Sequence, residues 1–361
     1  MDRNNDSVRS SVHDGYSKLV LNCFGIVRFE EMGNEMKVAI AQIAPVVLNR
    51  EATLEKVKQS IHQAADQDCR LIAFGETLVP AYPFWLCRTD AAKFDDSVQK
   101  GIHAKYLNEA VKIPSPEYPL GHHDDHLREI RQAAKERGIS VVMGVAERAV
   151  DRGGHTIYCS RVFVSGEGES KGEILSVHRK LMPTYEERLS WGIGDGAGLV
   201  THSVGDFSVG GLNCWENWLP LARATLYAAG ETLHVMLWPG CQRLTEDITR
   251  FVAKEGRLFV ISASGLIRNE DIPADVPHRE LMLDQEGIYD GGSCIAGPDG
   301  NWIVEPVLER ESLIVADLDA NRVLEERQNM DPSGHYSRPD VFQLKVNKTR
   351  QQIVVDWNKT E

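Results

Sequence analysis

The sequence lacks the features that mark a membrane-spanning, a disulfide-rich or a nucleic-acid-binding chain. It has no apolar run near the roughly 18 residues of a membrane span. Its seven cysteines are scattered and form no CxxC pair, so neither a zinc ribbon nor a disulfide framework is indicated. It has no excess of positive charge, because the formal net charge is −13, and this argues against nucleic acid or an anionic membrane as a partner. These absences favour a reduced, cytoplasmic protein.

What remains has the balance of a globular chain. The 361 residues are 42% hydrophobic and 26% charged, and they are numerous enough to bury a sizeable core. Residues 1–35 are polar, carry little periodicity and end in acidic side chains. We predict that they form a flexible N-terminal extension outside the main fold, and that a chain starting at Met36 keeps full activity.

From Met36 onward, patterns typical of strands and helices alternate. Helical periodicity predicts a helix after Asn49 and others over 124–137, 219–229 and 247–255. Short apolar runs predict strands over 38–43, 71–74, 139–145, 156–164, 174–178, 207–212, 233–237, 258–263, 294–296, 302–304 and 313–318. This alternation, with hairpins interposed, indicates a layered α/β fold that contains mixed sheets covered by helices.

Three reactive side chains follow directly after predicted strands, where open α/β folds place their sites: Glu76, Lys180 and Cys214. Cys214 stands between a strand and a helix, so we expect the helix dipole to lower the pKa of its thiol. Taken singly, each residue has an ordinary alternative: Cys214 as a structural buried cysteine, Glu76 as a capping acid and Lys180 as a surface lysine.

The segments around these residues resemble three motifs of the nitrilase, or carbon–nitrogen hydrolase, superfamily. Gly75–Pro83 (GETLVPAYP) resembles its glutamate motif, and His178–Arg188 (HRKLMPTYEER) resembles its lysine motif. Gly211–Asn217 (GLNCWEN) is similar to its cysteine motif. The resemblance runs from about residue 36 to about residue 344 and includes Gly334–Asp340 (GHYSRPD), a segment typical of nitrilases proper.

The resemblance implies a role for each motif residue. Cys214 is the implied nucleophile, Glu76 the general base and Lys180 the cation that stabilises the tetrahedral intermediate. Glu187 matches a second family glutamate that orders the site, with the adjacent Glu186 as the weaker match. The implied fold is a four-layer α-β-β-α sandwich of two mixed sheets. No metal or organic cofactor is expected, since the sequence supplies no ligand cluster for one.

The resemblance also implies the reaction. The continuation Cys214-Trp215-Glu216 is typical of the nitrilase branch, which hydrolyses a small organic nitrile to the carboxylic acid and ammonia through thioimidate and thioester intermediates. Cyanide hydratase or dihydratase activity and amidase-like activity on the same scaffold remain alternatives. A non-catalytic binding or self-assembling protein is the alternative from a different class.

Five aromatic residues near the motifs are candidates for a substrate pocket, and core packing is the alternative for each of them. These residues are Tyr82, Trp85, Trp191, Trp215 and Trp238. His234 is expected to be a satisfied core histidine. We predict a hydrolase domain over 36–320 and a C-terminal segment over 321–361 that takes part in assembly. Family members generally associate, so a homodimer or higher homo-oligomer is expected.

Overall fold

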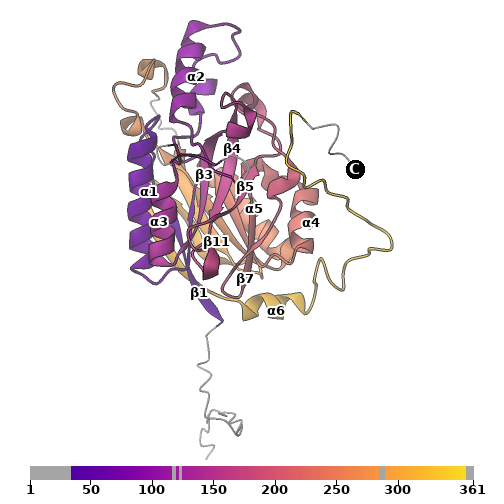
Figure 1. Ribbon diagram of the computed structural model, residues 1–361. Helices are drawn as coiled ribbons and strands as arrows, with labels where there is room; N and C mark the ends of the chain where they lie inside the picture. Colours follow the sequence, from indigo (N-terminus) through magenta and orange to yellow (C-terminus); the bar gives the residue numbers. More distant parts are fainter. Residues whose placement is uncertain (1–33, 116–118, 122–123, 284–288, 355–361) are drawn as a thin grey trace, which may run out of the picture. The chain divides into compact units, whose positions relative to one another are not determined.

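A computed structural model describes residues 34–115, 119–121, 124–283 and 289–354 of the chain (Figure 1). The predicted extension over residues 1–35 lies outside the described residues, apart from its last two. Strand β1 already begins at Glu35. The last residues of the predicted C-terminal segment, 355–361, also lie outside the described part.

Two mixed sheets form the centre of the described part. The first has the strand order β13-β1-β2-β3-β4-β5, with β1, β2 and β3 parallel and the outer strands antiparallel. Its strands are β1 (Glu35–Gln42), β2 (Leu71–Phe74), β3 (Ser140–Arg148), β4 (Ile157–Val164), β5 (Ile174–Arg179) and β13 (Ser312–Asp319). The predicted strands in these regions are therefore present.

The second sheet has the order β10-β11-β9-β8-β7-β6, with β12 paired to β11. Strands β7, β8 and β9 are parallel, while β6, β11 and β12 run antiparallel to their neighbours. The strands are β6 (His202–Val204), β7 (Phe207–Asn213), β8 (Leu233–Trp238), β9 (Phe259–Ser264), β10 (Leu266–Ile267), β11 (Tyr289–Ala296) and β12 (Trp302–Leu308).

Strand β2 shows how the sequence divides the layers. Leu71 and Ala73 lie in the apolar layer between the two sheets, where they join side chains from β7, β8 and β9. Ile72 and Phe74, at the alternate positions, lie in the cluster that packs under the helices. Because a strand buried on both faces needs apolar residues at every position, the short run LIAF forms a central strand of the sandwich.

Helices cover the outer faces of both sheets (Figure 1). Helices α1 (Arg50–Ala65) and α3 (Arg128–Arg137) pack on the first sheet, and the Asn49 side chain caps α1 by accepting from the Ala52 N–H at 3.0 Å. Helices α4 (Pro220–Ala228) and α5 (Gln242–Gly256) pack on the second sheet. The predicted four-layer α-β-β-α sandwich is confirmed.

Several helix boundaries differ from the prediction. The helix expected over 124–137 begins later, at Arg128, because the Asp125 carboxylate accepts from the Leu127 N–H at 3.2 Å and holds a turn there. The helix expected over 247–255 begins earlier, at Gln242, and the prediction missed its first turn because Leu244 is the one apolar residue there. Helix α2 (Ser97–Glu109) was not predicted, since it buries only Ile102 and Tyr106. Strand β6 and helix α6 (Asn321–Arg327) were also missed.

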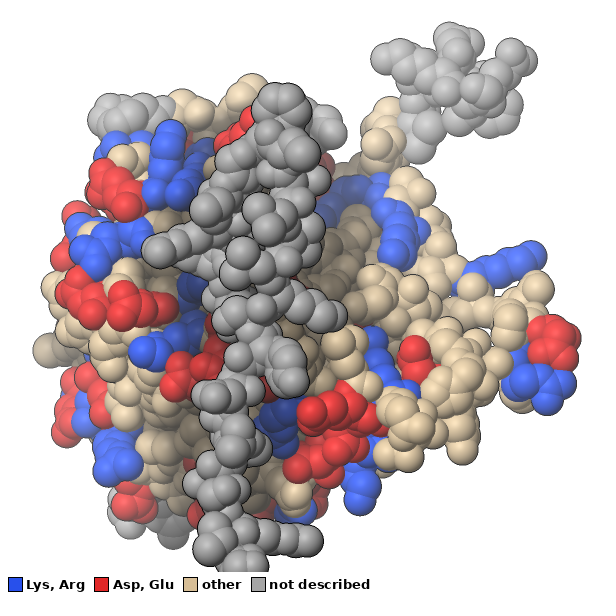
Figure 2. All heavy atoms as spheres, turned by 90° about the horizontal axis from the view of Figure 1, so that it is seen from below, with Lys and Arg blue, Asp and Glu red and all other residues tan. Residues whose placement is uncertain are grey.

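The surface agrees with an acidic chain of mixed charge. On the face drawn in Figure 2, lysines and arginines are interspersed with aspartates and glutamates over the described residues. A basic surface of the kind that binds a phosphate backbone needs lysines and arginines gathered on one face. Within the described residues, no helix has both the length and the apolar character needed to cross a membrane.

Candidate active site

Cys214 stands at a sharp turn where strand β7 ends at Asn213. Its backbone has a φ of +51°, a left-handed conformation that a non-glycine residue adopts only when its surroundings impose it. The turn continues into a short 3₁₀ helix over Cys214–Trp218, and the Glu216 carboxylate accepts from the Asn213 N–H at 2.9 Å. Gly211 permits close approach of the strands, since a Cβ there would lie 2.0 Å from the Val235 carbonyl oxygen. The turn thus presents the sulfur at the carboxyl end of the second sheet.

Buried polar groups support this turn from behind. His234 lies between the Glu231 carboxylate and the Asn217 side-chain oxygen, at 2.8 Å from each, and it is fully buried. Asn217 in turn donates through Nδ2 to the Cys214 carbonyl at 2.8 Å. His234 is therefore the satisfied core histidine that the sequence predicts, and it acts on the turn through Asn217.

Glu76 comes from the first sheet, directly after β2, and its N–H donates to the Trp238 carbonyl of the second sheet at 3.0 Å. The following residue, Thr77, has a φ of +43°, so the chain turns sharply here as well. The Glu76 side chain is 2% exposed. The two sheets therefore bring the ends of β2 and β7 to the same place.

Lys180 follows β5 and joins the carboxylates. Its ammonium donates to Glu76 Oε1 at 2.9 Å and to Glu187 Oε2 at 2.8 Å, and all three side chains are buried. The Cys214 sulfur and one carboxylate oxygen from each glutamate lie within 4.8 Å of one another. The three predicted residues and Glu187 thus form one buried cluster of a thiol, an ammonium and two carboxyl groups.

Glu187 owes its position to the segment after Lys180. The Thr184 N–H donates to Glu187 Oε2 at 2.6 Å, and this contact caps the 3₁₀ helix Tyr185–Leu189. The other oxygen, Oε1, accepts from the Tyr82 hydroxyl at 2.7 Å. Glu186 is only half-buried. Of the two glutamates considered from the sequence, Glu187 is the one that joins the cluster.

The charges in this cluster shift the pKa of each group in a definite direction. Burial raises the pKa of the Glu76 carboxyl to about 7, with Lys180 opposing the rise and Glu187 adding to it. Burial disfavours the charged form of Lys180, but the Cys214 sulfur and the two glutamate carboxyl groups outweigh it and hold the pKa of Lys180 well above its usual range. At neutral pH Lys180 therefore stays cationic, while Glu76 is able to take or release a proton.

The thiol differs from the prediction. Burial, followed by the Glu76 charge, raises the pKa of Cys214 well above its usual range, although Lys180 and the Trp215 N–H oppose the rise. The expected lowering of the pKa by a helix dipole is wrong, because a five-residue 3₁₀ helix has a small dipole and two carboxyl groups lie close by. Transfer of the thiol proton to Glu76 would leave the net charge of the cluster unchanged.

Comparisons with known proteins agree with this arrangement. The family model described as carbon–nitrogen hydrolase matches residues 37–328. The chain is 35% identical over 341 residues to an aliphatic nitrilase of Rhodococcus rhodochrous, covering 90% of this chain and 82% of that one. It is 32% identical over 339 residues to nitrilase 2 of Arabidopsis thaliana, covering 90% and 93%. The chain belongs to the carbon–nitrogen hydrolase family, in its nitrilase branch.

Solved structures show that this family fold is shared. A carbon–nitrogen hydrolase from Helicobacter pylori G27 superposes with a TM-score of 0.61 at 19% identity, covering 85% of this chain and 96% of that one. An amidase of the nitrilase superfamily from Nesterenkonia AN1 superposes with a TM-score of 0.56 at 17% identity, covering 81% and 94%. At these identities the likeness concerns the sandwich of two sheets.

The aromatic residues of this hydrolase fall into three places. Tyr82 and Trp191 contact the cluster, and their rings meet edge to face at 5.6 Å. The Tyr82 hydroxyl donates to the Glu187 carboxylate, and the Lys180 ammonium lies 5.4 Å from the centre of the Trp191 ring. Trp85 packs in the apolar cluster beside them, and Trp238 is fully buried under helix α5. Trp215 is 45% exposed on the surface. Tyr82 and Trp191 are therefore the strongest of the five pocket candidates.

Two residues near the cluster carried no signal in the sequence. Cys159, in the middle of β4, donates through its thiol to Glu76 Oε1 at 3.3 Å. Tyr289, at the start of β11, packs edge to face on Tyr82 at 5.6 Å, and burial raises its pKa. Both come from strands distant in sequence from the motifs, so only the sheet pairing brings them here.

Ion pairs hold the strand that leads to Lys180. Arg179, the last residue of β5, donates to Glu147 at 2.6 Å and to both oxygens of Asp151 at 2.6 and 2.9 Å. Burial opposes these contacts, but the two carboxylates outweigh it and raise the pKa of Arg179. Because Arg179 immediately precedes Lys180, this pairing fixes the strand end from which the ammonium projects.

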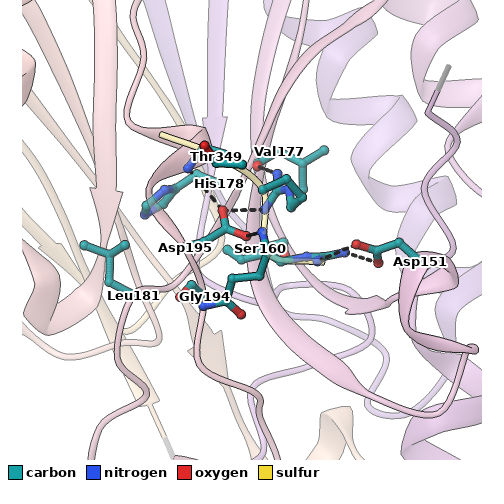
Figure 3. A network of polar contacts seen from close by, with 12 residues as sticks. Asp151, Ser160, Val177, His178, Leu181, Gly194, Asp195 and Thr349 are labelled. Carbon is teal, nitrogen blue, oxygen red and sulfur yellow. Dashed lines mark hydrogen bonds and ion pairs between the residues drawn. The ribbon is translucent and has the colours of Figure 1, made fainter. Parts of the chain in front are cut away.

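The C-terminal segment adds a second anchor, through contacts with Val177 and Asp195 (Figure 3). The Lys180 carbonyl accepts from the Gly194 N–H at 2.9 Å, and the adjacent Asp195 accepts from Arg350 at 3.0 Å. Arg350 also donates to the Val177 carbonyl at 2.6 Å. The described part of the C-terminal segment therefore ties β5 to the loop that supports the Lys180 backbone.

The cluster also has spacing that suits metal ligands. Among the described residues, Glu76, Glu187 and Cys214 form the group whose ligand atoms lie close enough to hold an ion. The Lys180 ammonium bridges both carboxylates and supplies the positive charge that such an ion would bring. These residues fit an internal ammonium better than a metal, and a metal-free site stays a prediction.

Proposed function

We propose that this protein hydrolyses a small organic nitrile to the carboxylic acid and ammonia, with Cys214 as the nucleophile. The observation that carries the proposal is the buried cluster in which a thiol lies within 4.8 Å of two carboxylates that a lysine bridges. Relatives at 31–35% identity that bear the names aliphatic nitrilase and arylacetonitrilase support the nitrile as substrate. In a glutamate-to-glutamine mutant of the structurally similar amidase from Nesterenkonia sp. AN1, acrylamide adds to the active-site cysteine by Michael addition.

The first half of the reaction attaches the nitrile to the enzyme. Glu76 accepts the Cys214 proton as the sulfur adds to the nitrile carbon, and the nitrogen receives that proton, which gives a neutral thioimidate. The thioimidate contains all the atoms of the nitrile and of the thiol. Since the carboxyl of Glu76 has a pKa of about 7, it suits a group that both accepts and returns a proton near neutral pH.

The second half uses two molecules of water. Glu76 takes a proton from the first water as it adds to the thioimidate carbon, and Lys180 stabilises the charge of the tetrahedral intermediate. The nitrogen receives both protons of this water, one returned by Glu76 and one from the new hydroxyl group as it becomes a carbonyl, and leaves as ammonia, so a thioester remains on Cys214. A second water then adds in the same way, releasing the carboxylic acid and restoring the thiol. Each step uses side chains of this chain alone, without a metal or organic cofactor.

Glu187 acts in this scheme by holding Lys180. It accepts from the ammonium at 2.8 Å and from the Tyr82 hydroxyl at 2.7 Å, so both of its oxygens are engaged. A carboxylate with engaged oxygens is a poorer base than one with a free oxygen, which makes Glu76 the better proton acceptor. We therefore assign orientation and charge balance to Glu187.

Substrate tests separate this function from its alternatives. The purified protein is incubated with an aromatic nitrile, an aliphatic nitrile, the matching amides and cyanide, and both ammonia and carbon products are measured. We expect acid and ammonia in equal amounts from a nitrile, with slow turnover of the amides. Turnover of cyanide alone would support a cyanide hydratase if the product is formamide, or a dihydratase if the products are formate and ammonia. Fast turnover of amides with inert nitriles would support an amidase. No turnover of any member would favour a non-catalytic protein.

We also propose that the protein works as a homodimer or higher homo-oligomer in the cytoplasm. Trp215, Trp218 and Phe251 stack on one another at ring distances of 6.2 and 6.3 Å and are 41–48% exposed, with the exposed Leu219 and Leu221 beside them. An apolar patch of this kind, formed by the 3₁₀ helix Cys214–Trp218, the start of α4 and one residue of α5, fits a second copy of the chain. Sedimentation analysis of the protein and of its Leu221→Glu variant tests this, since the variant should shift toward the monomer.

The six free cysteines in the described residues fit the reducing compartment that the cytoplasm provides.

A further inference from the structure

A second thiol lies inside the catalytic cluster and has no part in the scheme above. Cys159, on β4, is 1% exposed, and its sulfur lies 3.3 Å from Glu76 Oε1. The same residue accepts through its carbonyl from the Lys180 N–H at 2.8 Å. The side chain of Asn213, which immediately precedes Cys214, approaches the Cys159 sulfur through Nδ2 at 3.7 Å. Cys159 therefore contacts the segments that carry all three catalytic residues.

The Cys159 thiol stays protonated in these surroundings. Burial raises its pKa well above the usual range, and the neighbouring Glu76 carboxylate raises it further. A neutral thiol next to a carboxylate is a hydrogen-bond donor, whereas the carboxylate is an acceptor only. The contact is thus an S–H donating to Oε1, and the sulfur at the same time accepts from Asn213.

The two oxygens of Glu76 have different surroundings as a result. Oε1 accepts from both Lys180 and Cys159. Oε2 is buried and has no hydrogen-bond partner among the described residues. An unpartnered buried oxygen is costly unless a reactant uses it, and of the two oxygens it is the one free to accept a proton.

We propose that Cys159 is a positioning residue for the general base: its S–H binds Glu76 Oε1, fixes the rotation of the carboxyl group and leaves Oε2 free for the proton of Cys214. This inference rests on the proposed function, because it presumes that Glu76 is the base. Cys159 forms no bond with the substrate. Its effect is on the orientation of Glu76 and on the pH at which Glu76 loses its proton.

Three variants test the proposal by their kcat, KM and pH profiles. Cys159→Ala removes the donor, and we expect kcat to fall about tenfold with KM little changed, as for loss of one hydrogen bond to a charged group. The acidic limb of the kcat/KM profile should move to higher pH, because the bond from Cys159 lowers the pKa of Glu76. Cys159→Ser keeps a donor and should recover most of the lost rate. Where Cys159→Ala is too unstable to assay, Cys159→Val replaces it as the variant without a donor.

Cys294→Ala is the matched control. Cys294 is fully buried in β11 and donates its thiol to Thr249 Oγ1 at 3.5 Å, away from the catalytic cluster. Its removal should leave kcat and the pH profile unchanged. A donor-free variant of Cys159 with the wild-type kcat and acidic limb would overturn the proposal. So would Cys159→Ser if it matched the donor-free variant.

Glu76→Gln separates failure of this inference from failure of the proposed function. If Glu76→Gln is inactive while the donor-free Cys159 variant behaves as wild type, Glu76 keeps its role and only the role of Cys159 is rejected. If Glu76→Gln keeps full activity, Glu76 is not the base, and both the mechanism and the inference drawn from it fail.

Discussion

The electrostatic coupling between Glu187 and Glu76 gives the sharpest prediction. Glu187→Gln removes one negative charge but keeps an amide oxygen that can accept from Lys180. The two carboxyl groups have oxygens within 4.8 Å of each other, and at an effective dielectric constant of about 20 this separation is worth about 3 kcal/mol, or about two pH units. Since Lys180 screens part of this interaction, we expect the pKa of Glu76 to fall from about 7 by at least about one unit.

The rate at which iodoacetamide alkylates Cys214 reports this pKa directly, because Glu76 must be unprotonated to accept the thiol proton. The rate is measured from pH 5 to 9, roughly two units on either side of 7, by mass spectrometry of the Cys214 peptide. The exposed Cys87 serves as a reference thiol in the same sample. In the wild-type protein the rate should rise with a midpoint near pH 7, and in Glu187→Gln the midpoint should lie at lower pH.

Glu186→Gln is the control for that shift. Glu186 carries the same charge one residue earlier but is half-buried and lies outside the cluster, so its removal should leave the midpoint in place. A Glu187→Gln midpoint that is unchanged or higher would refute the electrostatic reasoning. Equal shifts in the two variants would show that the effect is not specific to the cluster.

Further predictions concern the other parts of the site and the chain ends. Cys214→Ala should abolish turnover in an ammonia-release assay while its melting temperature stays close to wild type. Glu76→Gln and Lys180→Ala should each lower kcat by at least about a hundredfold in the same assay, because members of one catalytic unit do not act additively. Arg350→Ala removes hydrogen bonds from a partly exposed side chain and should lower the free energy of unfolding, measured in urea, by about 1 kcal/mol. An unchanged urea midpoint would show that this anchor contributes nothing to stability. A chain starting at Met36 should keep the wild-type kcat and KM, and a large loss would give the N-terminal residues a role.

The sequence predicted the layers of the fold because each layer has its own pattern. The run Leu71–Phe74 is apolar at every position, as a strand buried on both faces requires, and the resemblance supplied the number of layers. Helix α2 was not predicted because it buries only Ile102 and Tyr106 and so lacks an apolar stripe. The first residue of a helix differs from the prediction where the first turn is largely polar, or where a side-chain hydrogen bond such as that of Asp125 holds a turn before the helix.

For the site, the motifs identified the residues, and their meeting in space then followed from the sheet order. The pKa of Cys214 was predicted in the wrong direction, because a local argument from a helix dipole omits two carboxyl groups brought from other strands. Cys159 was missed for a similar reason: nothing in its own segment sets it apart, and its contact with Glu76 arises from the pairing of β3 with β4. Charge interactions and hydrogen bonds between distant segments are therefore the properties that are hardest to predict from a single sequence.

The covalent intermediate on Cys214 is the central claim, and mass spectrometry of the Cys214 peptide tests it most directly. The enzyme is mixed with a nitrile that it hydrolyses, quenched in acid during turnover and digested. The account predicts an adduct on the Cys214 peptide whose added mass equals that of the nitrile, for the thioimidate, or that of the acid less one water, for the thioester. Undiminished turnover by Cys214→Ala, or an adduct confined to another residue, would contradict it.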